Sequence, residues 1–169
     1  MLLAALSSMA AACSVAQQRA ESDDAAFALQ RTACFGDCPV YSVAVEAEGH
    51  VICIGSEHTR ELGVRTSRIE PQVRRRIVEA LRVLASMQNS YEFEKDGCGR
   101  TWTDQPSVML SVHSSRMDKH VVLYYGCQGG RVADDTRKID ALAREIDEAV
   151  ASQRWTGLAH PPTLADLPQ

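Results

Sequence analysis

Two hydrophobic periodicities, arranged in a fixed order, constrain the fold of this chain more than any other feature. Runs in which apolar residues alternate are typical of strands with one buried face, and runs with a period of 3.6 residues are typical of amphipathic helices. In chain order we expect strands over 27–33, 40–45, 51–54 and 61–66, a helix over 71–87, strands over 108–112 and 120–125, and a helix over 135–152. This order predicts an α+β fold, with an antiparallel sheet of four to six strands and two helices packed on one face.

The same patterns assign roles to individual side chains. Tyr41, Val43 and Val45 share one face of their strand, which we expect to be buried. Asp134 and Asp135 stand where the second helix should begin and are N-cap candidates. The polar side of the first helix carries four arginines, which we interpret as a solvated surface rather than an anion site: Arg74, Arg75, Arg76 and Arg82.

Length and composition limit the number of domains. A chain of 169 residues with 45% hydrophobic and 24% charged residues has room for one ordinary globular domain, which we place at residues 27–155. The tail over 156–169 holds too few apolar residues to pack and is expected to be flexible. The net charge of -4 offers no basic surface for phosphate groups, so nucleic acid is not an expected partner.

The N-terminus has the features of an export signal. Residues 1–16 are apolar or small over a block that is too short to span a bilayer, which takes roughly 20 residues. Residues 10–13 resemble a bacterial lipobox, in which Cys13 would be lipidated, whereas cleavage after the small residues 14–16 would remove Cys13. A polar tether follows over 17–26. We therefore expect the bacterial cell envelope, periplasmic or lipid-anchored to a membrane, with a cytosolic protein as the alternative.

Five cysteines remain in the domain, and export to an oxidising compartment favours disulfides between them. Cys34 and Cys38 are close enough in sequence for a local bridge worth about 2 kcal/mol in the chain-entropy model. Cys98, in the long loop over 88–106, and Cys127, after the last strand, form the second predicted pair, which would contribute about 3–4 kcal/mol. Cys53 then remains as a buried free thiol.

Thiol exchange and metal binding are the rival interpretations of Cys34 and Cys38. Oxidoreductases of the thioredoxin type use a Cys-x-x-Cys spacing at a helix N-terminus, and the chain has neither feature here. A zinc site would need ligands from elsewhere, such as Cys127, His113 or His120, and no second paired motif accompanies them.

Other catalytic signatures are missing from the sequence. The glycine-rich stretch 126–130 lacks the ending of a phosphate-binding loop and is expected to be a strand-to-helix turn. Asp96, Asp104 and the glutamates of 92–94 gather in one loop, but nothing pairs them at a catalytic spacing. Without a nucleophile and base, the sequence favours a non-enzymatic protein, and we expect no catalytic residue, cofactor or metal.

Residues 31–41, with the string Cys-Phe-Gly-Asp-Cys-Pro-Val-Tyr, resemble a family of bacterial exported domains known as domain of unknown function 6438. The turn at 48–49, the helix led by Pro71, and the segments 103–106 and 124–126 match the layout of that family in the same order. The resemblance covers residues 27–150 and implies export, but it brings no established activity.

Together these features predict a non-enzymatic binding or accessory module of the envelope. Its partner would be an unknown envelope protein or a small ligand, and its only membrane contact would be a lipid on Cys13. The alternative function is thiol redox chemistry or metal handling by Cys34 and Cys38.

Overall fold

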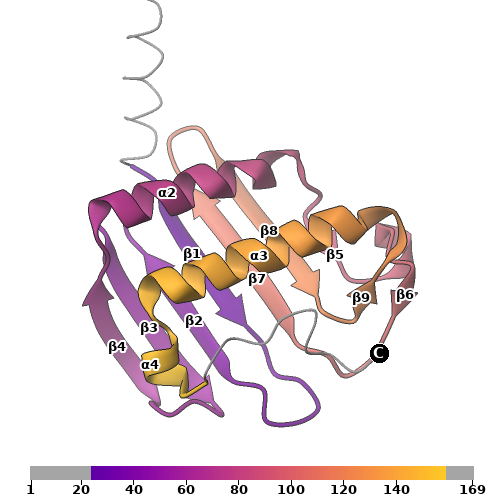
Figure 1. The fold of residues 1–169 in the computed structure, drawn as a ribbon, viewed down its shortest axis with the longest axis horizontal. Helices are drawn as coiled ribbons and strands as arrows, with labels where there is room; N and C mark the ends of the chain where they lie inside the picture. Colours follow the sequence, from indigo (N-terminus) through magenta and orange to yellow (C-terminus); the bar gives the residue numbers. More distant parts are fainter. Residues whose placement is uncertain (1–23, 159–169) are drawn as a thin grey trace, which may run out of the picture.

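The computed structural model describes residues 24–158. The lipobox with Cys13 and most of the predicted tether and tail lie outside this range. The described chain has an α+β fold, in which helices cover one face of a large sheet (Figure 1). No helix among the described residues is long and apolar enough to cross a membrane.

Seven strands form the main sheet in the order β4-β3-β2-β1-β7-β8-β5. Their bounds are Ala26–Arg31 (β1), Val40–Val45 (β2), His50–Glu57 (β3), Gly63–Arg68 (β4), Ser90–Tyr91 (β5), Ser107–His113 (β7) and Asp118–Tyr124 (β8). A separate antiparallel pair joins β6 (Arg100–Thr101) to β9 (Cys127–Gln128). Neighbouring strands of the main sheet are antiparallel except β5, which runs parallel to β8.

The α+β class is confirmed, but the prediction of four to six antiparallel strands is wrong in two respects. The sheet has seven strands, and β5 runs parallel to its neighbour β8. The extra strands β5 and β6 lie in the segment 88–106, which was expected to be one long loop, together with a 3-10 turn at Glu94–Asp96. A strand of two residues is too short to show hydrophobic alternation. Such a strand forms only because it pairs with β8 or β9, which lie far along the chain.

The core lies between the sheet and its helices. Phe27, Leu29, Val43 and other inward positions of the central strands are at most 3% exposed, and the predicted buried face containing Tyr41 is confirmed. Two helices, α2 (Pro71–Leu81) and α3 (Ala133–Val150), cover these positions with apolar side chains such as those of Ile77, Leu81, Ile139 and Ile146. Each such side chain contributes about 1.5–3 kcal/mol by leaving water.

The helix boundaries differ from the prediction at three ends. The first helix stops at Leu81 and continues as a 3-10 turn over Arg82–Ser86, so the expected single helix to residue 87 is divided. The second begins at Ala133, which puts the expected N-caps Asp134 and Asp135 in its first turn, where the helix dipole also favours carboxylates. It ends before Ala151, whose φ of 54° is left-handed, and a short helix α4 (Gln153–Thr156) follows.

Arg74 corrects the expectation of a fully solvated arginine surface on α2. Its side chain is 3% exposed, and Nη1 donates a hydrogen bond of 2.8 Å to the carbonyl oxygen of Ala25. Arg74 therefore ties α2 to the residue that leads into β1, while Arg75, Arg76 and Arg82 lie nearer the surface.

Candidate functional site

A small disulfide-closed ring connects β1 to β2. Cys34 and Cys38 are bonded, with their Cα atoms 5.6 Å apart, and both are partly exposed. Gly36 has a φ of 143°, which side chains with a Cβ rarely adopt, so the tight turn inside the ring favours glycine. We call residues 34–38 the ring.

Phe35 is held on this ring with its side chain in solvent. The aromatic side chain is 89% exposed, the largest exposure among the described large hydrophobic residues. Its backbone N–H donates a hydrogen bond of 3.0 Å to the carbonyl oxygen of Asp104. Beside the ring, the N–H of Thr32 donates to the Ser107 carbonyl at 3.1 Å, and the N–H of Ser107 donates to Oγ1 of Thr32 at 2.8 Å. The backbone that carries Phe35 is therefore fastened on the side of the turn that follows β1.

The loop after β3 also lies against the ring. Nδ1 of His58, which follows β3, lies 3.5 Å from Oδ1 of Asp37, and the Asp37 side chain is 96% exposed. His58 and Asp104 are two of the three described non-glycine residues with positive φ, at 51° and 66°. Such backbone conformations gather at binding sites as well as at tight turns. We call Phe35, Asp37, His58 and Asp104 the rim.

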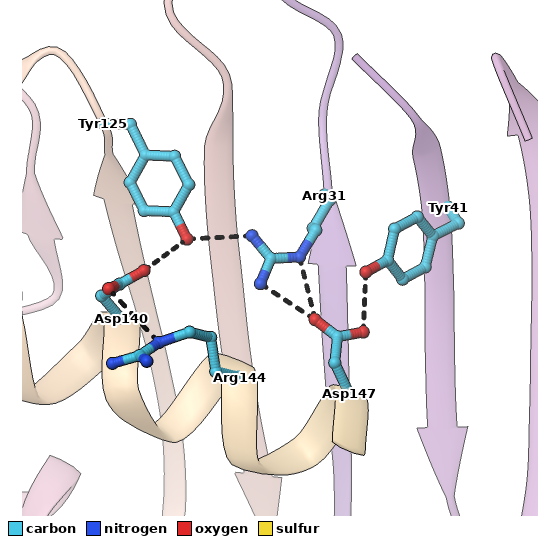
Figure 2. A network of polar contacts seen from close by, with 6 residues as sticks. All are labelled: Arg31, Tyr41, Tyr125, Asp140, Arg144 and Asp147. Carbon is cyan, nitrogen blue, oxygen red and sulfur yellow. Dashed lines mark hydrogen bonds and ion pairs between the residues drawn. The ribbon is translucent and has the colours of Figure 1, made fainter. Parts of the chain in front are cut away.

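A buried polar network lies at the base of the ring, between the sheet and α3 (Figure 2). Arg31 is the last residue of β1, and its Nε and Nη2 donate to Oδ2 of Asp147 at 3.1 and 2.9 Å. Tyr41, just after the ring, donates its hydroxyl to Oδ1 of the same carboxylate at 2.6 Å. Because Arg31 is 2% exposed and Asp147 is 0% exposed, both ends of the ring segment are anchored to one buried group on α3.

The network continues toward β9 through a second carboxylate. Nη1 of Arg31 donates to the hydroxyl oxygen of Tyr125 at 2.9 Å, and that hydroxyl donates to Oδ1 of Asp140 at 2.9 Å. Nε of Arg144 lies 3.6 Å from Oδ2 of Asp140 at the surface of the helix (Figure 2). Asp140 and Asp147 are seven residues apart in α3, so both point toward the sheet.

Burial and neighbouring charges set the protonation of this network. Burial, followed by the charge of Asp147, raises the pKa of Tyr41 well above its ordinary value. Burial also raises the pKa of Tyr125. Burial alone would lower the pKa of Arg31, but Tyr125 and Asp147 outweigh it and keep the pKa above its usual value. At neutral pH the hydroxyl groups of Tyr41 and Tyr125 are therefore neutral and Arg31 is a cation, an arrangement suited to holding position.

A family model described as Domain of unknown function (DUF6438) matches residues 25–150. The chain belongs to this family. The matched region includes the ring, every strand of the main sheet and all of α3. A search of curated proteins finds no significant match.

In this DUF6438 domain the remaining cysteines adopt the pairing that the sequence analysis proposed. Cys98 and Cys127 are bonded, with Cα atoms 5.2 Å apart, which fastens the segment 88–106 to β9. Cys53 is a free thiol in β3 and is 1% exposed. Burial, with Asp147 nearby, raises the pKa of Cys53 to about 11. Cys13 lies outside the described residues.

The proposed zinc ligands do not come together in the DUF6438 domain. His113 pairs with Ala26 at the start of β1, so it lies at the opposite end of the sheet from the ring, and Cys127 is bonded to Cys98. His120 faces Ser111 in the middle of the sheet, with Nδ1 2.9 Å from the Ser111 hydroxyl. Among residues 24–158, no group of three or more metal-ligating side chains is suitably placed for an ion.

The loop carboxylates have separate roles. Oδ2 of Asp96 accepts the N–H groups of Glu92 and Phe93, each at 3.1 Å, so Asp96 closes a turn. Those backbone hydrogen bonds, that of Glu92 first, lower the pKa of Asp96. Asp104 belongs to the rim, and its Oδ2 accepts a hydrogen bond of 2.9 Å from the hydroxyl of Thr103.

Sequence reasoning missed the network of the DUF6438 domain. It placed Tyr41 on a buried face but assigned no role to Arg31, Tyr125, Asp140 or Asp147. A signal was present, because Arg31 continues the period-two series of Phe27 and Leu29 and must therefore point inward. An arginine at an inward position requires a buried acceptor.

Proposed function

We propose that this chain is a non-enzymatic binding or accessory module of the bacterial cell envelope, lipid-anchored through Cys13 or free in the periplasm. We further propose that it binds its partner through the rim. The observation that carries this proposal is the 89% exposure of Phe35 on a ring that is closed by a disulfide.

The energetics of recognition favour such a site. A phenylalanine side chain gains about 1.5–3 kcal/mol when it leaves water, and Phe35 obtains almost none of this within its own chain. Binding normally costs about 0.5–1.5 kcal/mol for each flexible side chain that becomes ordered, and ordering a loop adds to this cost. The disulfide, the hydrogen bond to Asp104 and the buried contacts of Arg31 and Tyr41 already order the loop. Phe35 thus has the properties of a preorganised aromatic anchor.

The position of the rim suits a protein that is tethered to a membrane. The chain enters β1 at Ala26 and reaches the ring after Arg31, so the rim lies at the end of the sheet opposite to the start of β1 (Figure 1). About 11 residues separate Cys13 from Asp24, and at roughly 3.3–3.6 Å each they reach at most about 40 Å. A lipid-anchored chain would present the rim away from the bilayer.

The alternative function, thiol exchange by Cys34 and Cys38, is favoured only by the partial exposure of their disulfide. The ring lies between two strands and lacks the helix N-terminus that lowers a thiol pKa in oxidoreductases. The exposed carboxylate of Asp37 within the ring would oppose a thiolate.

Site-specific photo-cross-linking in cells tests the binding function. A benzophenone amino acid replaces Phe35 in one variant and Phe93 in the control, because Phe93 is also exposed, at 49%, but lies outside the rim. We expect one discrete adduct from position 35 and none from position 93. In a binding assay with that partner, Phe35→Ala should weaken binding about 30-fold, as loss of a 2 kcal/mol hot spot does, and Phe93→Ala should not. Equal binding by both variants would refute the role of the rim.

The alternative is tested by the thiol state of the exported protein. Alkylation before and after reduction, followed by mass spectrometry, should show Cys34 and Cys38 protected until reductant is added. Free Cys34 and Cys38 in the exported protein, or zinc that copurifies with it, would favour redox or metal handling instead. The same spectra report whether Cys13 carries a lipid.

A further inference from the structure

The main sheet ends in a strand whose outer side has no partner strand among residues 24–158. In the strand order, β4 is outermost on one side, and the strand that closes the other side, β5, has only two residues (Figure 1). An edge strand presents backbone N–H and C=O groups that can pair with another strand. The edge formed by β4 is therefore the long open edge of the described sheet.

The register of β4 against β3 determines which backbone groups point outward. The N–H of Ile69 donates a hydrogen bond of 3.0 Å to the carbonyl oxygen of Gly49, so Ile69 faces β3. Successive residues of a strand direct their N–H and C=O groups to opposite sides. Val64, Thr66 and Arg68 therefore direct theirs away from β3, toward the open edge.

Exposed apolar side chains gather beside this edge. Three of the six described large hydrophobic residues that are exposed lie here: Ile54, Leu62 and Val64, at 41%, 62% and 58%. Ile54 and Val64 are directly paired, and Leu62 immediately precedes β4. An exposed apolar patch marks an interaction site, and here it adjoins the outward backbone groups.

Few of the usual devices that block strand pairing are present on β4. The strand contains no proline, and its register with β3 is regular, in contrast to the irregular register between β2 and β3. Charged side chains are the device that remains, at Arg65 and Arg68. Arg65 donates to the Glu61 carboxylate at 3.1 and 2.7 Å and to the Val64 carbonyl at 2.9 Å. Of these three contacts of Arg65, only the last uses an outward backbone group.

We propose that β4 pairs antiparallel with β4 of a second copy of this chain, about a two-fold axis that passes between the two Thr66 residues and is perpendicular to the sheet. In this register Thr66 lies opposite the second copy's Thr66, and Val64 lies opposite the second copy's Arg68. All three outward residues of one strand then oppose outward residues of the other, and each of the three pairs exchanges two backbone hydrogen bonds. An axis at Arg65 or Ser67 would leave one outward residue without a partner in the opposing strand.

The side chains suit this register. Directly opposed threonines stabilise antiparallel strands, and the aliphatic stem of Arg68 covers the second copy's Val64, which is 58% exposed in the single chain. On the side that faces the helices, Arg65 lies opposite the second copy's Ser67, so no two like charges are directly opposed. The two Arg65 side chains lie diagonally across the axis, each beside its own Glu61.

The pairing joins the two sheets into one and leaves both rims open. Because the two copies of β4 run in opposite directions, the rims and the tethers of the two copies lie at opposite ends of the joined sheet. A strand of six residues is about 20 Å long, whereas a tether of about 11 residues reaches at most about 40 Å. Both tethers can therefore reach one bilayer, and the rims of such a pair point outward along its surface. The pairing itself does not depend on the anchor.

Cysteine cross-linking of the full chain with Cys13→Ser, which cannot be lipidated, tests the register. Thr66→Cys places two thiols on backbones about 5.5 Å apart at the axis, which is within disulfide range. The matched control is Arg68→Cys, on the same face of the same strand, because its two copies lie about 14 Å apart. Among the described native cysteines, Cys53 is buried and the others are bonded, so the introduced thiol is the accessible one.

Under air oxidation, Thr66→Cys should form a disulfide-linked dimer at least about tenfold faster than Arg68→Cys. Equal rates for the two variants, or no dimer from Thr66→Cys, would overturn the proposed register.

Sedimentation equilibrium of the Cys13→Ser chain measures the dimer without a cross-link. One added strand makes a small interface, so we expect a dissociation constant of roughly 10–100 µM. The mass should rise with concentration from 18.5 kDa toward twice that value. A chain that remains monomeric at about 500 µM, well above that range, would refute the pairing.

A pair of substitutions separates backbone pairing from other contacts. Thr66→Pro removes an outward N–H and leaves the hydrogen bonds to β3 in place, so it should weaken the dimer at least about tenfold. Thr66→Val keeps the N–H and should stay within about threefold of the parent chain. If Thr66→Pro does not fold, Thr66→Lys replaces it, because two ammonium groups then oppose each other at the axis. Equal dissociation constants for the disrupting variant and Thr66→Val would contradict the proposal.

Photo-cross-linking in cells identifies the occupant of the edge. A benzophenone amino acid in place of Thr66 should capture a second copy of the chain. Capture of a different protein would show that another strand occupies this edge and would overturn the self-pairing. None of these variants changes the rim, which is tested separately at Phe35.

Discussion

Replacement of Asp147 is the most direct test of the role that we assign to the buried network. Its carboxylate is 0% exposed and accepts two hydrogen bonds from Arg31, at 3.1 and 2.9 Å, and one of 2.6 Å from Tyr41. The substitution Asp147→Asn preserves the size of the side chain and removes its charge. Arg31 then remains a cation that is 2% exposed, with the Tyr125 hydroxyl as its remaining acceptor within the network.

The expected loss of stability follows from removing the carboxylate that faces this buried cation. Breaking a buried ion pair by removing one partner costs about 3–5 kcal/mol, whereas the whole domain is stable by about 5–15 kcal/mol. With a urea slope of about 2 kcal/mol/M, the unfolding midpoint should fall by about 1.5–2.5 M. The matched control is Asp134→Asn, in the exposed pair with Arg137 at the start of α3, which should change stability by no more than about 1 kcal/mol.

Urea unfolding, followed by the fluorescence of Trp102 and Trp155, measures the difference. If Asp147→Asn fails to fold, the variant Arg31→Met/Asp147→Leu replaces the pair with apolar groups and should regain most of the stability. The reasoning is refuted if Asp147→Asn unfolds at the same midpoint as Asp134→Asn, or if the double variant is less stable than Asp147→Asn.

Three further outcomes follow from the structure. Asp96→Ala should unfold at a lower urea concentration than wild type at pH 6, and this difference in unfolding midpoint should narrow as the pH falls below 3.8. The reason is that folding lowers the pKa of Asp96, so the unfolded chain binds more protons in acid and the stability contributed by the Asp96 carboxylate is lost. An unchanged gap at pH 3 would contradict it. Cys53, with a pKa of about 11 and 1% exposure, should resist iodoacetamide at pH 8 in the folded protein and react in urea. Cys98→Ala/Cys127→Ala opens a loop of 29 residues and should cost about 3.5 kcal/mol, as seen by urea unfolding, and a loss below 1 kcal/mol would contradict the entropic estimate.

The long elements were predictable because each carries its own repeat of apolar residues. The strands β1, β2, β7 and β8 and the helix α3 lie within a few residues of their predicted positions, and α2 begins at the predicted Pro71. The short strands β5, β6 and β9 could not be predicted, since two residues have no period and their pairing depends on partners far along the chain. For the same reason the sequence could not predict that β5 runs parallel to β8.

The candidate site was predictable only in part, for a different physical reason. Cysteine spacing and loop lengths restrict which bridges can close, so the ring could be inferred. Exposure of Phe35 depends on what else packs near the turn, and apolar residues are assigned to the core by default. The polar network was missed for the opposite reason, because charged residues on a helix are assigned to the solvent by default. Asp140 and Asp147 can be placed in the interior only when the orientation of α3 on the sheet is known.

The network offers a physical reason for joining a costly buried charge to an exposed loop. A buried ion pair seldom adds stability over an apolar pair of the same volume, but its directional hydrogen bonds accept only one arrangement of the elements. Arg31 leads into the ring, Tyr41 leads out of it, and both bind Asp147. An apolar contact would allow α3 to slide by a fraction of a turn, and the ring would then tilt with it. If the rim is a binding surface, the Arg31→Met/Asp147→Leu variant should therefore keep its fold and lose affinity for the partner, although neither residue is near Phe35 at the surface.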